Sequence, residues 1–342
     1  MDNSPFHLQA HVDNLYEENS RQFAFHAQTK DAFYEWQQRT RSKLQELLGL
    51  TGRDLSASPL AESLWIVDRG DYHEEKLILH SSEDVKIPIY ILQPKTPPPY
   101  KPILAFHGHD PSVQYILGNY PNPQIARQQR SQDANYAQAL AQAGYLVVAV
   151  EQRGFGERIT EQYDISRQSA CRHLSFEYLL QGRTMIGERC WDGMMALTYI
   201  QSRDDVVPGT IGCTGHSGGG TTALWLSAMD ERITVCIVSG CFSTFKHSIL
   251  GVEHCECNYV PGILACCEMG DLAALIAPRP LLLIAGEHDS IFPLKDALRQ
   301  FEIVRQAYTI HSRAEQGSLA SHSGGHAYNQ PLARNWFQEW LK

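Results

Sequence analysis

The sequence lacks the features that mark nucleic-acid-binding, membrane-spanning and exported proteins. Its 29 Lys and Arg residues are outnumbered by 38 Asp and Glu residues, which gives a formal net charge of −9, and no basic cluster could follow a phosphate backbone. No stretch approaches the roughly 18 apolar residues of a membrane-spanning helix, and the amino terminus has neither the basic start nor the apolar centre of a secretory signal. We therefore expect no nucleic-acid or membrane partner and a cytoplasmic location.

Cysteine is present, but not in the pattern of a disulfide framework or a zinc site. The chain has 9 cysteines, so at least one cannot pair within it, and without an export signal we expect reduced thiols. The segment HCECNYVPGILACC holds His254, Cys255, Cys257, Cys266 and Cys267. Zinc sites usually place about two to four residues between paired cysteines, whereas one residue lies between Cys255 and Cys257 and none between Cys266 and Cys267. The sequence thus predicts no metal and no other cofactor.

The composition is that of a globular protein. Hydrophobic residues make up 43% and charged residues 20% of the 342 residues, which suits one large domain with additions better than two equal domains. Residues 20–50 carry leucines at roughly helical spacing, and Gly49 and Gly52 supply stops. These leucines are Leu44, Leu47, Leu48 and Leu50. We predict an N-terminal helical extension over residues 1–60 that covers its own sheet or packs on a second subunit, so a homo-oligomer stays open.

Residues 61–342 show alternating strand and helix patterns. Three short segments with β-branched and alternating residues, 63–70, 75–81 and 86–94, indicate antiparallel strands at a sheet edge. Almost purely apolar runs separated by helical lengths then follow at 103–108, 145–150, 210–215, 235–240 and 280–286. Strands without polar alternation are buried on both faces, as in a parallel sheet with helices on each side. We predict a doubly wound, mostly parallel α/β sheet.

Two connections are longer than ordinary loops. Residues 155–183 and 241–279 are expected to contain short helices over one end of the sheet. Connections of this size at the carboxyl edge of a parallel sheet usually shape a pocket.

A serine pentapeptide, GHSGG at 215–219, follows the third apolar run and precedes a predicted helix, and it fits the pattern G-x-S-x-G. A serine on so tight a turn adopts strained dihedrals, and glycines two residues to either side avoid collisions with the strand and the helix. A glycine turn that binds phosphate is the alternative, but no Lys follows as in a P-loop. We predict that Ser217 is a nucleophile.

A serine nucleophile needs a base and an acid that orients the base, and after such a pentapeptide the chain order is Ser, then Asp or Glu, then His. Asp289 lies beyond the last apolar run and is our predicted acid, with Glu287 as the alternative. His326 follows two glycines near a terminal helix and is the predicted base, while His322 and His311 remain open.

The oxyanion of a tetrahedral intermediate needs two donors. One should be the backbone amide of Gly218, the residue after the nucleophile, and the other should come from the loop after the first apolar run. The amide of His109 is our choice in that loop, although the preceding Gly108 could simply end the strand.

Several stretches resemble the α/β-hydrolase superfamily, and within it the acetyl xylan esterase and dienelactone hydrolase-like esterases. The likeness spans roughly residues 100–330, and its stretches are AFHGHD, EQRGFGER, GRTMIGERCWDGMMALTYIQSRDDV, GHSGGG, VPGIL, DLAALIAPRPLLLIAGEHDSIFP and GGHAYN. The resemblance implies an α/β-hydrolase catalytic domain over residues 61–342 and a serine esterase that acts through an acyl-enzyme. It implies the triad Ser217, Asp289 and His326, and acetylated sugars or other small short-acyl esters as substrates.

Two positions depart from the pattern of that family. Asp110 stands where glycine is common, so the oxyanion loop is expected to have a different shape, and Glu151 stands where aspartate is common. Arg153 nearby is predicted to be an ion-pair partner, because an arginine cannot act as a base at neutral pH.

Two other functions compete with the esterase. A serine peptidase of the prolyl-oligopeptidase type shares such a domain, but only about 100 residues precede the first core strand, too few for a propeller of several four-stranded blades. A non-catalytic hydrolase-like binding protein would have no need of the complete ordered triad.

Overall fold

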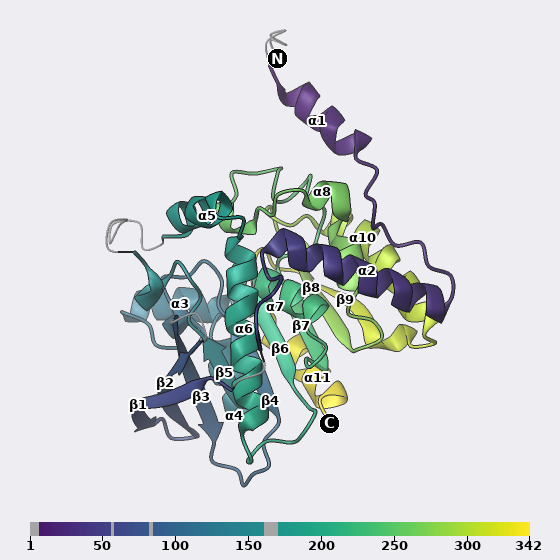
Figure 1. The fold of residues 1–342 in the computed structure, drawn as a ribbon. Helices are drawn as coiled ribbons and strands as arrows, with labels where there is room; N and C mark the ends of the chain where they lie inside the picture. Colours follow the sequence, from purple (N-terminus) through teal and green to yellow (C-terminus); the bar gives the residue numbers. More distant parts are fainter. Residues whose placement is uncertain (1–6, 56–57, 82–84, 161–169) are drawn as a thin grey trace.

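The computed structural model describes residues 7–55, 58–81, 85–160 and 170–342, and its central feature is a nine-stranded sheet with helices on both faces (Figure 1). The strand order is β1-β2-β3-β5-β4-β6-β7-β8-β9. The strands are β1 (Leu60–Asp68), β2 (Tyr72–His80), β3 (Lys86–Pro94), β4 (Pro102–Phe106), β5 (Leu146–Val150), β6 (Gly212–His216), β7 (Val235–Ser239), β8 (Leu281–Gly286) and β9 (Gly317–His322). The α-helices are α1 (Gln9–Glu18), α2 (Lys30–Leu48), α3 (Pro123–Ser131), α4 (Tyr136–Gln142), α5 (Cys171–Leu180), α6 (Met185–Ser202), α7 (Gly218–Met229), α8 (Ile263–Cys266), α9 (Met269–Ala274), α10 (Leu294–Ile310) and α11 (Gln330–Trp340).

The sheet combines an antiparallel edge with a parallel centre. β1, β2 and β3 pair antiparallel and join the sheet through the antiparallel pair β3 and β5. The strands from β5 through β4 to β9 all pair in parallel. Every residue of β4, β5, β7 and β8 is buried, as expected for strands covered on both faces. The predicted doubly wound sheet with antiparallel N-terminal edge strands is confirmed.

The sequence gives little sign of β9. Its residues, GSLASH, are small and polar and only partly buried, so they form no apolar run. The segment nevertheless pairs in parallel with β8 and forms an edge strand of the sheet. The paired residues run from Leu281 with Gly317 to Gly286 with His322. Backbone hydrogen bonds to a neighbouring strand, rather than side-chain burial, form this strand, and they place the loop that follows it beside the end of β8.

The predicted helix at 20–50 is shorter than expected and has a separate helix before it. α2 begins after Thr29, whose hydroxyl accepts a hydrogen bond from Ala32 N (3.3 Å), and ends at Gly49 with φ +72°. Phe33, Leu44 and Leu48 on α2 belong to the same buried cluster as the central strands. α1 buries no residue and projects from the body of the molecule (Figure 1). α2 therefore packs against α6 and α7, two helices that cover the sheet of the same chain, while the division at residue 60 stays a prediction.

The two long connections contain short helices, as predicted, within the described residues. Residues 155–183 include a 3₁₀ turn (Gly156–Arg158) and α5, and the predicted stretch 161–169 lies outside the described residues. Residues 241–279 include a 3₁₀ turn (Glu256–Asn258, η3), α8 and α9. α5 packs against both η3 and α6, so the two connections meet on one side of the molecule.

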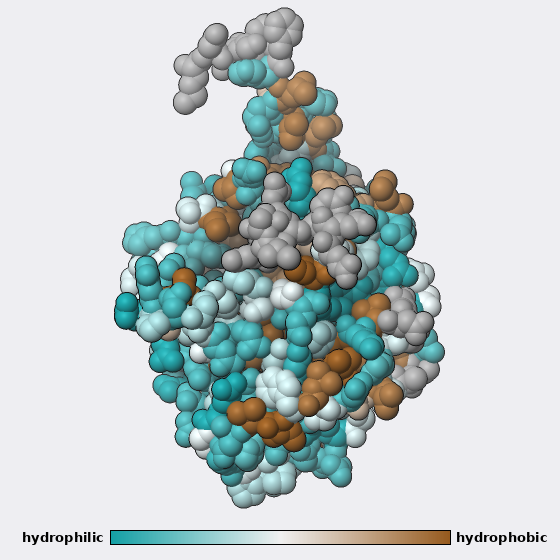
Figure 2. All heavy atoms as spheres, turned by 90° about the vertical axis from the view of Figure 1, so that its left-hand side faces the viewer, coloured by the Kyte–Doolittle hydropathy of each residue, from teal (hydrophilic) through white to brown (hydrophobic). Residues whose placement is uncertain are grey.

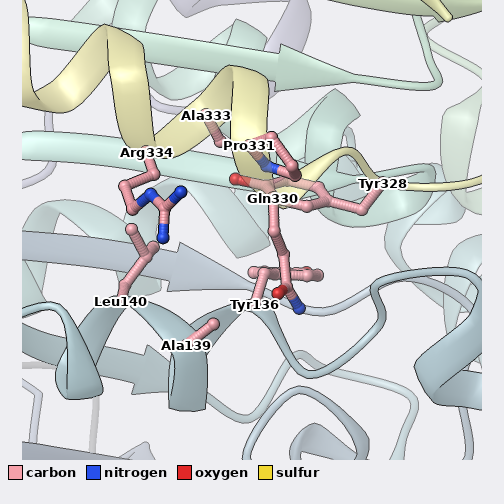
Figure 3. A pocket seen from close by; sticks show the side chains of 8 residues that line it. All are labelled: Tyr136, Ala139, Leu140, Tyr328, Gln330, Pro331, Ala333 and Arg334. Carbon is pink, nitrogen blue, oxygen red and sulfur yellow. The ribbon is translucent and has the colours of Figure 1, made fainter.

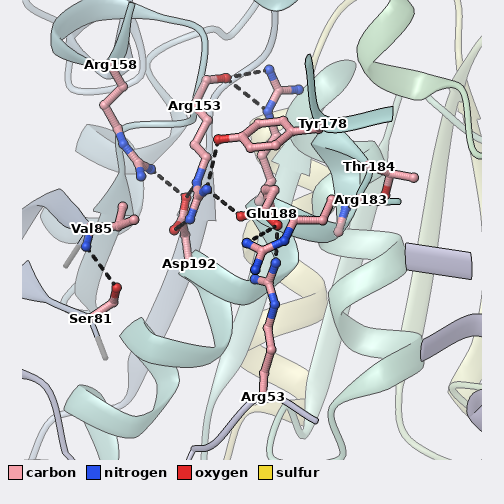
Figure 4. Close-up of polar contacts among 12 residues, drawn as sticks. Arg53, Ser81, Val85, Arg153, Arg158, Tyr178, Arg183, Thr184, Glu188 and Asp192 are labelled. Carbon is pink, nitrogen blue, oxygen red and sulfur yellow. Dashed lines mark hydrogen bonds and ion pairs between the residues drawn. The ribbon is translucent and has the colours of Figure 1, made fainter. Parts of the chain in front are cut away.

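Arg153 anchors a buried ion-pair network after β5 (Figure 4). Its guanidinium donates to both carboxylate oxygens of Asp192, at 2.9 and 2.8 Å, and also to Glu188. Arg158 Nη1 donates to Asp192 Oδ2 at 2.5 Å, while Glu188 also accepts from Arg53. The two carboxylates lie on α6 and are almost completely buried. Arg153 is thus an ion-pair partner, as predicted, and the network fixes the loop after β5 to α6.

Figure 2 shows the surface of the molecule that includes the edge strand β1. Polar side chains cover most of this surface, and its apolar side chains form several patches separated by polar ones. Leu60, Leu64 and Ile66 of the edge strand β1 are exposed. In the described part of the chain, we find no helix with the length and apolar character needed to cross a membrane.

Candidate active site

Ser217 occupies a strained turn between β6 and α7. Its backbone has φ 55° and ψ −123°, a conformation that a residue with a side chain adopts only when the surroundings enforce it. A Cβ atom at Gly215 would lie 2.2 Å from Gly219 O, and one at Gly219 would lie 2.0 Å from Phe106 O. A Cβ at Gly220 would lie 2.5 Å from Ser239 O. All three glycines are therefore required by close backbone contacts around Ser217.

Asp289 and His326 are in direct contact. Asp289 follows β8, and its Oδ2 accepts a hydrogen bond from His326 Nδ1 at 2.7 Å. Its Oδ1 accepts from the backbone amides of Ile291 (2.8 Å) and Phe292 (3.1 Å). Burial raises the pKa of Asp289, but the hydrogen bond and charge of His326, together with the two amides, outweigh burial and lower this pKa below its ordinary value. The carboxylate is thereby held ionised against His326.

Aromatic rings hold the imidazole of His326 in place. Phe292 stacks on it with a centroid distance of 5.9 Å and an interplanar angle of 18°, and His216 lies at 4.7 Å. Burial, followed by the proximity of His326, lowers the pKa of His216 to about 3. His216 is therefore neutral at pH 7 and places no positive charge beside His326.

One cavity of about 180 Å³ brings the candidate nucleophile and base together. Ser217 and His326 both line this cavity, so the residue on the strained turn and the residue held by Asp289 face the same space. The other lining residues are Gly108, His109, Asp110, Gln129, Gln132, Ala134, Tyr136 and His216. The cavity could hold a small ligand group next to Ser217.

The loop after β4 touches the strained turn. A Cβ at Gly108 would lie 3.1 Å from His216 O and 3.3 Å from Ser217 Cβ, so this loop approaches the nucleophile closely. The His109 ring lies against Gly218, where a Cβ would be 2.8 Å from Nδ1. Part of the His109 ring faces solvent, yet the surrounding protein lowers the pKa of its imidazole to about 4, chiefly by desolvation. The predicted donor loop and Gly218 are thus neighbours.

The alternative acid and bases lie elsewhere. Glu287 accepts a hydrogen bond from Ser321 Oγ at 3.3 Å, rather than from His326. His322 Nδ1 accepts a hydrogen bond from Gly324 N at 3.1 Å. Neither Glu287 nor His322 lines the cavity of Ser217. His311 packs edge-on against Phe33, at 4.5 Å between ring centroids. Of the candidates, the structure brings together Asp289 and His326.

The two departures from the family pattern have different roles. Asp110 lines the cavity, and burial raises the pKa of its carboxyl group. Glu151 is buried, accepts a hydrogen bond from Val113 N at 3.0 Å and lies 3.0 Å from His107 Nε2. Glu151 therefore supports the loop after β4, whereas Asp110 borders the space where a substrate would lie.

A second cavity, of about 110 Å³, lies between α4 and α11 (Figure 3). Tyr136 and Tyr328 stack there at 4.3 Å. Tyr136 also lines the cavity of Ser217, and its hydroxyl donates to Phe106 O at 2.5 Å. The second cavity is lined by Tyr136, Ala139, Leu140, Tyr328, Gln330, Pro331, Ala333 and Arg334, which include no serine, cysteine or histidine. Its lining therefore offers no nucleophile of those types.

The sequence patterns did not reveal one cluster next to the loop after β4. The metal-ligating atoms of His109, Cys171, Cys255 and Cys257 all lie within 4.8 Å of one another. The segment 254–267 holds only Cys255 and Cys257 of this cluster, whereas His109 and Cys171 come from distant parts of the chain. A local pattern could not have shown this cluster.

Comparisons with known proteins agree with this fold. Residues 7–340 match the model of the Abhydrolase family. The chain is 30% identical over 306 residues to "Putative hydrolase YtaP" of Bacillus subtilis, covering 87% of this chain and 98% of that protein. A crystal structure of a putative acetyl xylan esterase from Bacteroides fragilis is similar with a TM-score of 0.77 and 18% identity, covering 98% of this chain and 90% of that one. A glucuronoyl esterase from Solibacter usitatus is similar with a TM-score of 0.66 and 14% identity, covering 91% and 92%.

Proposed function

The chain belongs to the Abhydrolase family of α/β-hydrolases, and from this membership we propose that it is a serine esterase acting on carboxylic esters. One observation carries the proposal. Ser217, on a strained turn, and His326, which Asp289 orients at 2.7 Å, line the same cavity. A nucleophile, a base and an acid in this arrangement are the parts that acyl transfer requires.

In the proposed mechanism, His326 removes the proton of the Ser217 hydroxyl while Asp289 holds the imidazole in the correct tautomer. Ser217 Oγ then attacks the ester carbonyl, and the amides of Gly218 and His109 bind the oxyanion of the tetrahedral intermediate. His326 returns the proton to the leaving alcohol, which leaves an acyl-enzyme. Water, activated by the same histidine, hydrolyses the acyl-enzyme and frees Ser217.

The proposed substrates are acetylated sugars or oligosaccharides, or other small short-acyl esters. A cavity of about 180 Å³ supports a short acyl group. The similar solved structures include a putative acetyl xylan esterase and a glucuronoyl esterase, both of which are named for esters of carbohydrates. We propose a small-molecule ester as the partner and a cytoplasmic location, and a homo-oligomer stays open.

The test compares Ser217→Ala with Ser321→Ala, a serine on β9 outside the cavity. Hydrolysis of p-nitrophenyl acetate by Ser217→Ala should fall at least about 10³-fold, while Ser321→Ala stays near wild type. A fluorophosphonate probe should label wild type at Ser217. Retention of most activity by Ser217→Ala would show that another residue is the nucleophile.

A substrate panel separates esterase from peptidase. We expect acetyl esters and acetylated xylo-oligosaccharides to be hydrolysed faster than butyryl and longer esters. Peptide amides should be hydrolysed slowly or not at all. Faster cleavage of peptide amides would favour a peptidase, and no turnover of any ester would favour a binding protein.

A further inference from the structure

Four side chains from three distant segments converge beside the loop after β4. His109 belongs to that loop, Cys171 begins α5, and Cys255 and Cys257 lie at η3. Their potential ligand atoms all lie within 4.8 Å of one another, and His109 Nε2 is 3.3 Å from Cys257 Sγ. Convergence of one imidazole and three thiols is a feature of tertiary structure, because residues 109, 171 and 255 are far apart in the chain.

The chemistry of these ligands selects the ion. Three thiolates and one neutral imidazole are soft and borderline ligands, which favour zinc over calcium or magnesium. With Zn–S near 2.3 Å and Zn–N near 2.0 Å, a tetrahedral site separates its ligand atoms by roughly 3.5–3.8 Å. The 3.3 Å between His109 Nε2 and Cys257 Sγ is close to this range, and the 4.8 Å limit on the other separations includes it. We propose that His109, Cys171, Cys255 and Cys257 form a tetrahedral zinc site.

A buried arginine supplies the charge balance that such a site needs. Zn²⁺ with three thiolates has a net charge of about −1, and the thiol protons leave on binding. Arg189 on α6 is 2% exposed, and its Nη2 donates to Cys171 Sγ at 3.1 Å and to Arg153 O at 2.8 Å. Within the described residues, no ion pair joins Arg189 to a carboxylate. Its cationic guanidinium therefore offsets the negative charge of the metal–thiolate centre.

Other contacts around the cluster also suit a metal centre. Asn258 Nδ2 donates to Cys257 Sγ at 3.4 Å, the kind of hydrogen bond that orients and stabilises a bound thiolate. Cys257 and Cys171 are buried, whereas Cys255 is partly exposed and His109 retains exposed surface. The exposed side gives an ion access, and the buried side shields the completed site from water.

The cluster touches the proposed catalytic machinery through one ring. His109 turns Nε2 toward Cys257, and the Cε1–Nδ1 edge of the same ring lies against Gly218. A metal bound at Nε2 would hold the loop whose amide is proposed to bind the oxyanion, a consequence that rests on the proposed function. With four protein ligands the metal has no open position, so its role is structural.

Metal content tests the site directly. Purified wild-type protein should carry about one zinc per chain, and the zinc-free protein with Co²⁺ should show the visible bands of tetrahedral cobalt and a thiolate charge-transfer band. Cys257→Ser and Cys171→Ser should lose stoichiometric metal and both spectral features. Cys266→Ser is the matched control, because Cys266 is buried in the same connection but lies outside the cluster, and it should keep the metal.

Several results would overturn the site. One is the absence of a thiolate–cobalt band in reduced, folded wild-type protein, and another is stoichiometric zinc retained by Cys257→Ser. The zinc site would also be contradicted by a stable disulfide among Cys171, Cys255 and Cys257. Mass spectrometry of protein purified without reductant would detect such a disulfide. Ser217→Ala should bind metal like wild type, so failure of the esterase proposal and failure of the metal site give different results.

Discussion

At the scale of single residues, hydrogen bonding and burial give Asp289 and Asp110 opposite tendencies. Asp289 accepts from His326 and two backbone amides, which together lower its pKa despite burial. Asp110 faces the cavity, and burial, as the main cause, raises its pKa. The first carboxyl group is thus held ionised, while the second is pushed toward its neutral form.

Replacing Asp289 with Asn should lower kcat for p-nitrophenyl acetate by about 10³- to 10⁴-fold, because an amide facing His326 Nδ1 favours the wrong tautomer. Folding should persist, since the Asn oxygen can still accept from Ile291 and Phe292. Steady-state kinetics check the loss, and circular dichroism checks the fold. Glu287→Gln is the control and should stay near wild type; a similar loss there would favour Glu287 as the acid.

Asp110→Asn should make the protein more stable at neutral pH. Because the folded-state pKa is raised, the folded protein holds this proton more tightly than the unfolded chain does. The free energy of unfolding therefore falls as the pH rises from the ordinary aspartate pKa to the raised pKa of Asp110 in the folded protein. The loss of stability persists at higher pH. The substitution should raise the unfolding temperature at pH 7 and have less effect near pH 3.5. An equal shift at both pH values would contradict this assignment.

At the scale of elements, steric contacts make the turn from β6 to α7 possible. The carbonyl of Phe106 on β4 occupies the place that a Cβ at Gly219 would take. Neither β4 nor α7 can move away freely, because β4 pairs on both sides and every residue of α7 is buried. The G-x-S-x-G pattern thus describes a close contact between neighbouring elements as much as a catalytic serine.

Gly219→Ala should destabilise the protein by at least about 3 kcal/mol or prevent folding, because the new Cβ would lie 2.0 Å from Phe106 O. Gly325→Ala is the matched control, since its Cβ would meet only ordinary contacts at 3.6 Å or more. Urea unfolding monitored by fluorescence measures both variants. Equal stability of the two would mean that the turn can relax around an added methyl group.

At the scale of the whole molecule, one network joins segments that are distant in the chain. Glu188 on α6 accepts from Arg153 after β5, from Arg53 after α2 and from Arg183 before α6, the last at 3.3 Å (Figure 4). Its side chain is fully buried. The network therefore links the N-terminal helical segment to the central sheet, in addition to the apolar contacts of α2.

Glu188→Gln should destabilise the folded state by about 3–5 kcal/mol, because a neutral amide would then face three guanidinium groups in a buried site. Glu302→Gln is the control. Glu302 pairs with Arg305 on the exposed face of α10. Loss of this ion pair should lower the free energy of unfolding by less than about 1 kcal/mol. Chemical unfolding of both variants gives the comparison. A small effect at Glu188 would mean that water or a rearranged side chain compensates the arginines.

The amino-acid sequence was enough to predict the buried parallel strands, the antiparallel edge and the candidates Ser217, Asp289 and His326, because strand burial and motif order are local patterns. Other features depend on contacts between distant segments, which are visible in the folded structure. Backbone pairing with β8 forms β9. The contact of Asp289 with His326 favours His326 over His322 as the base. The fold also brings His109 to three cysteines from two other segments. Such contacts depend on how distant segments pack, and neither spacing nor composition encodes that packing in a form that a single sequence reveals.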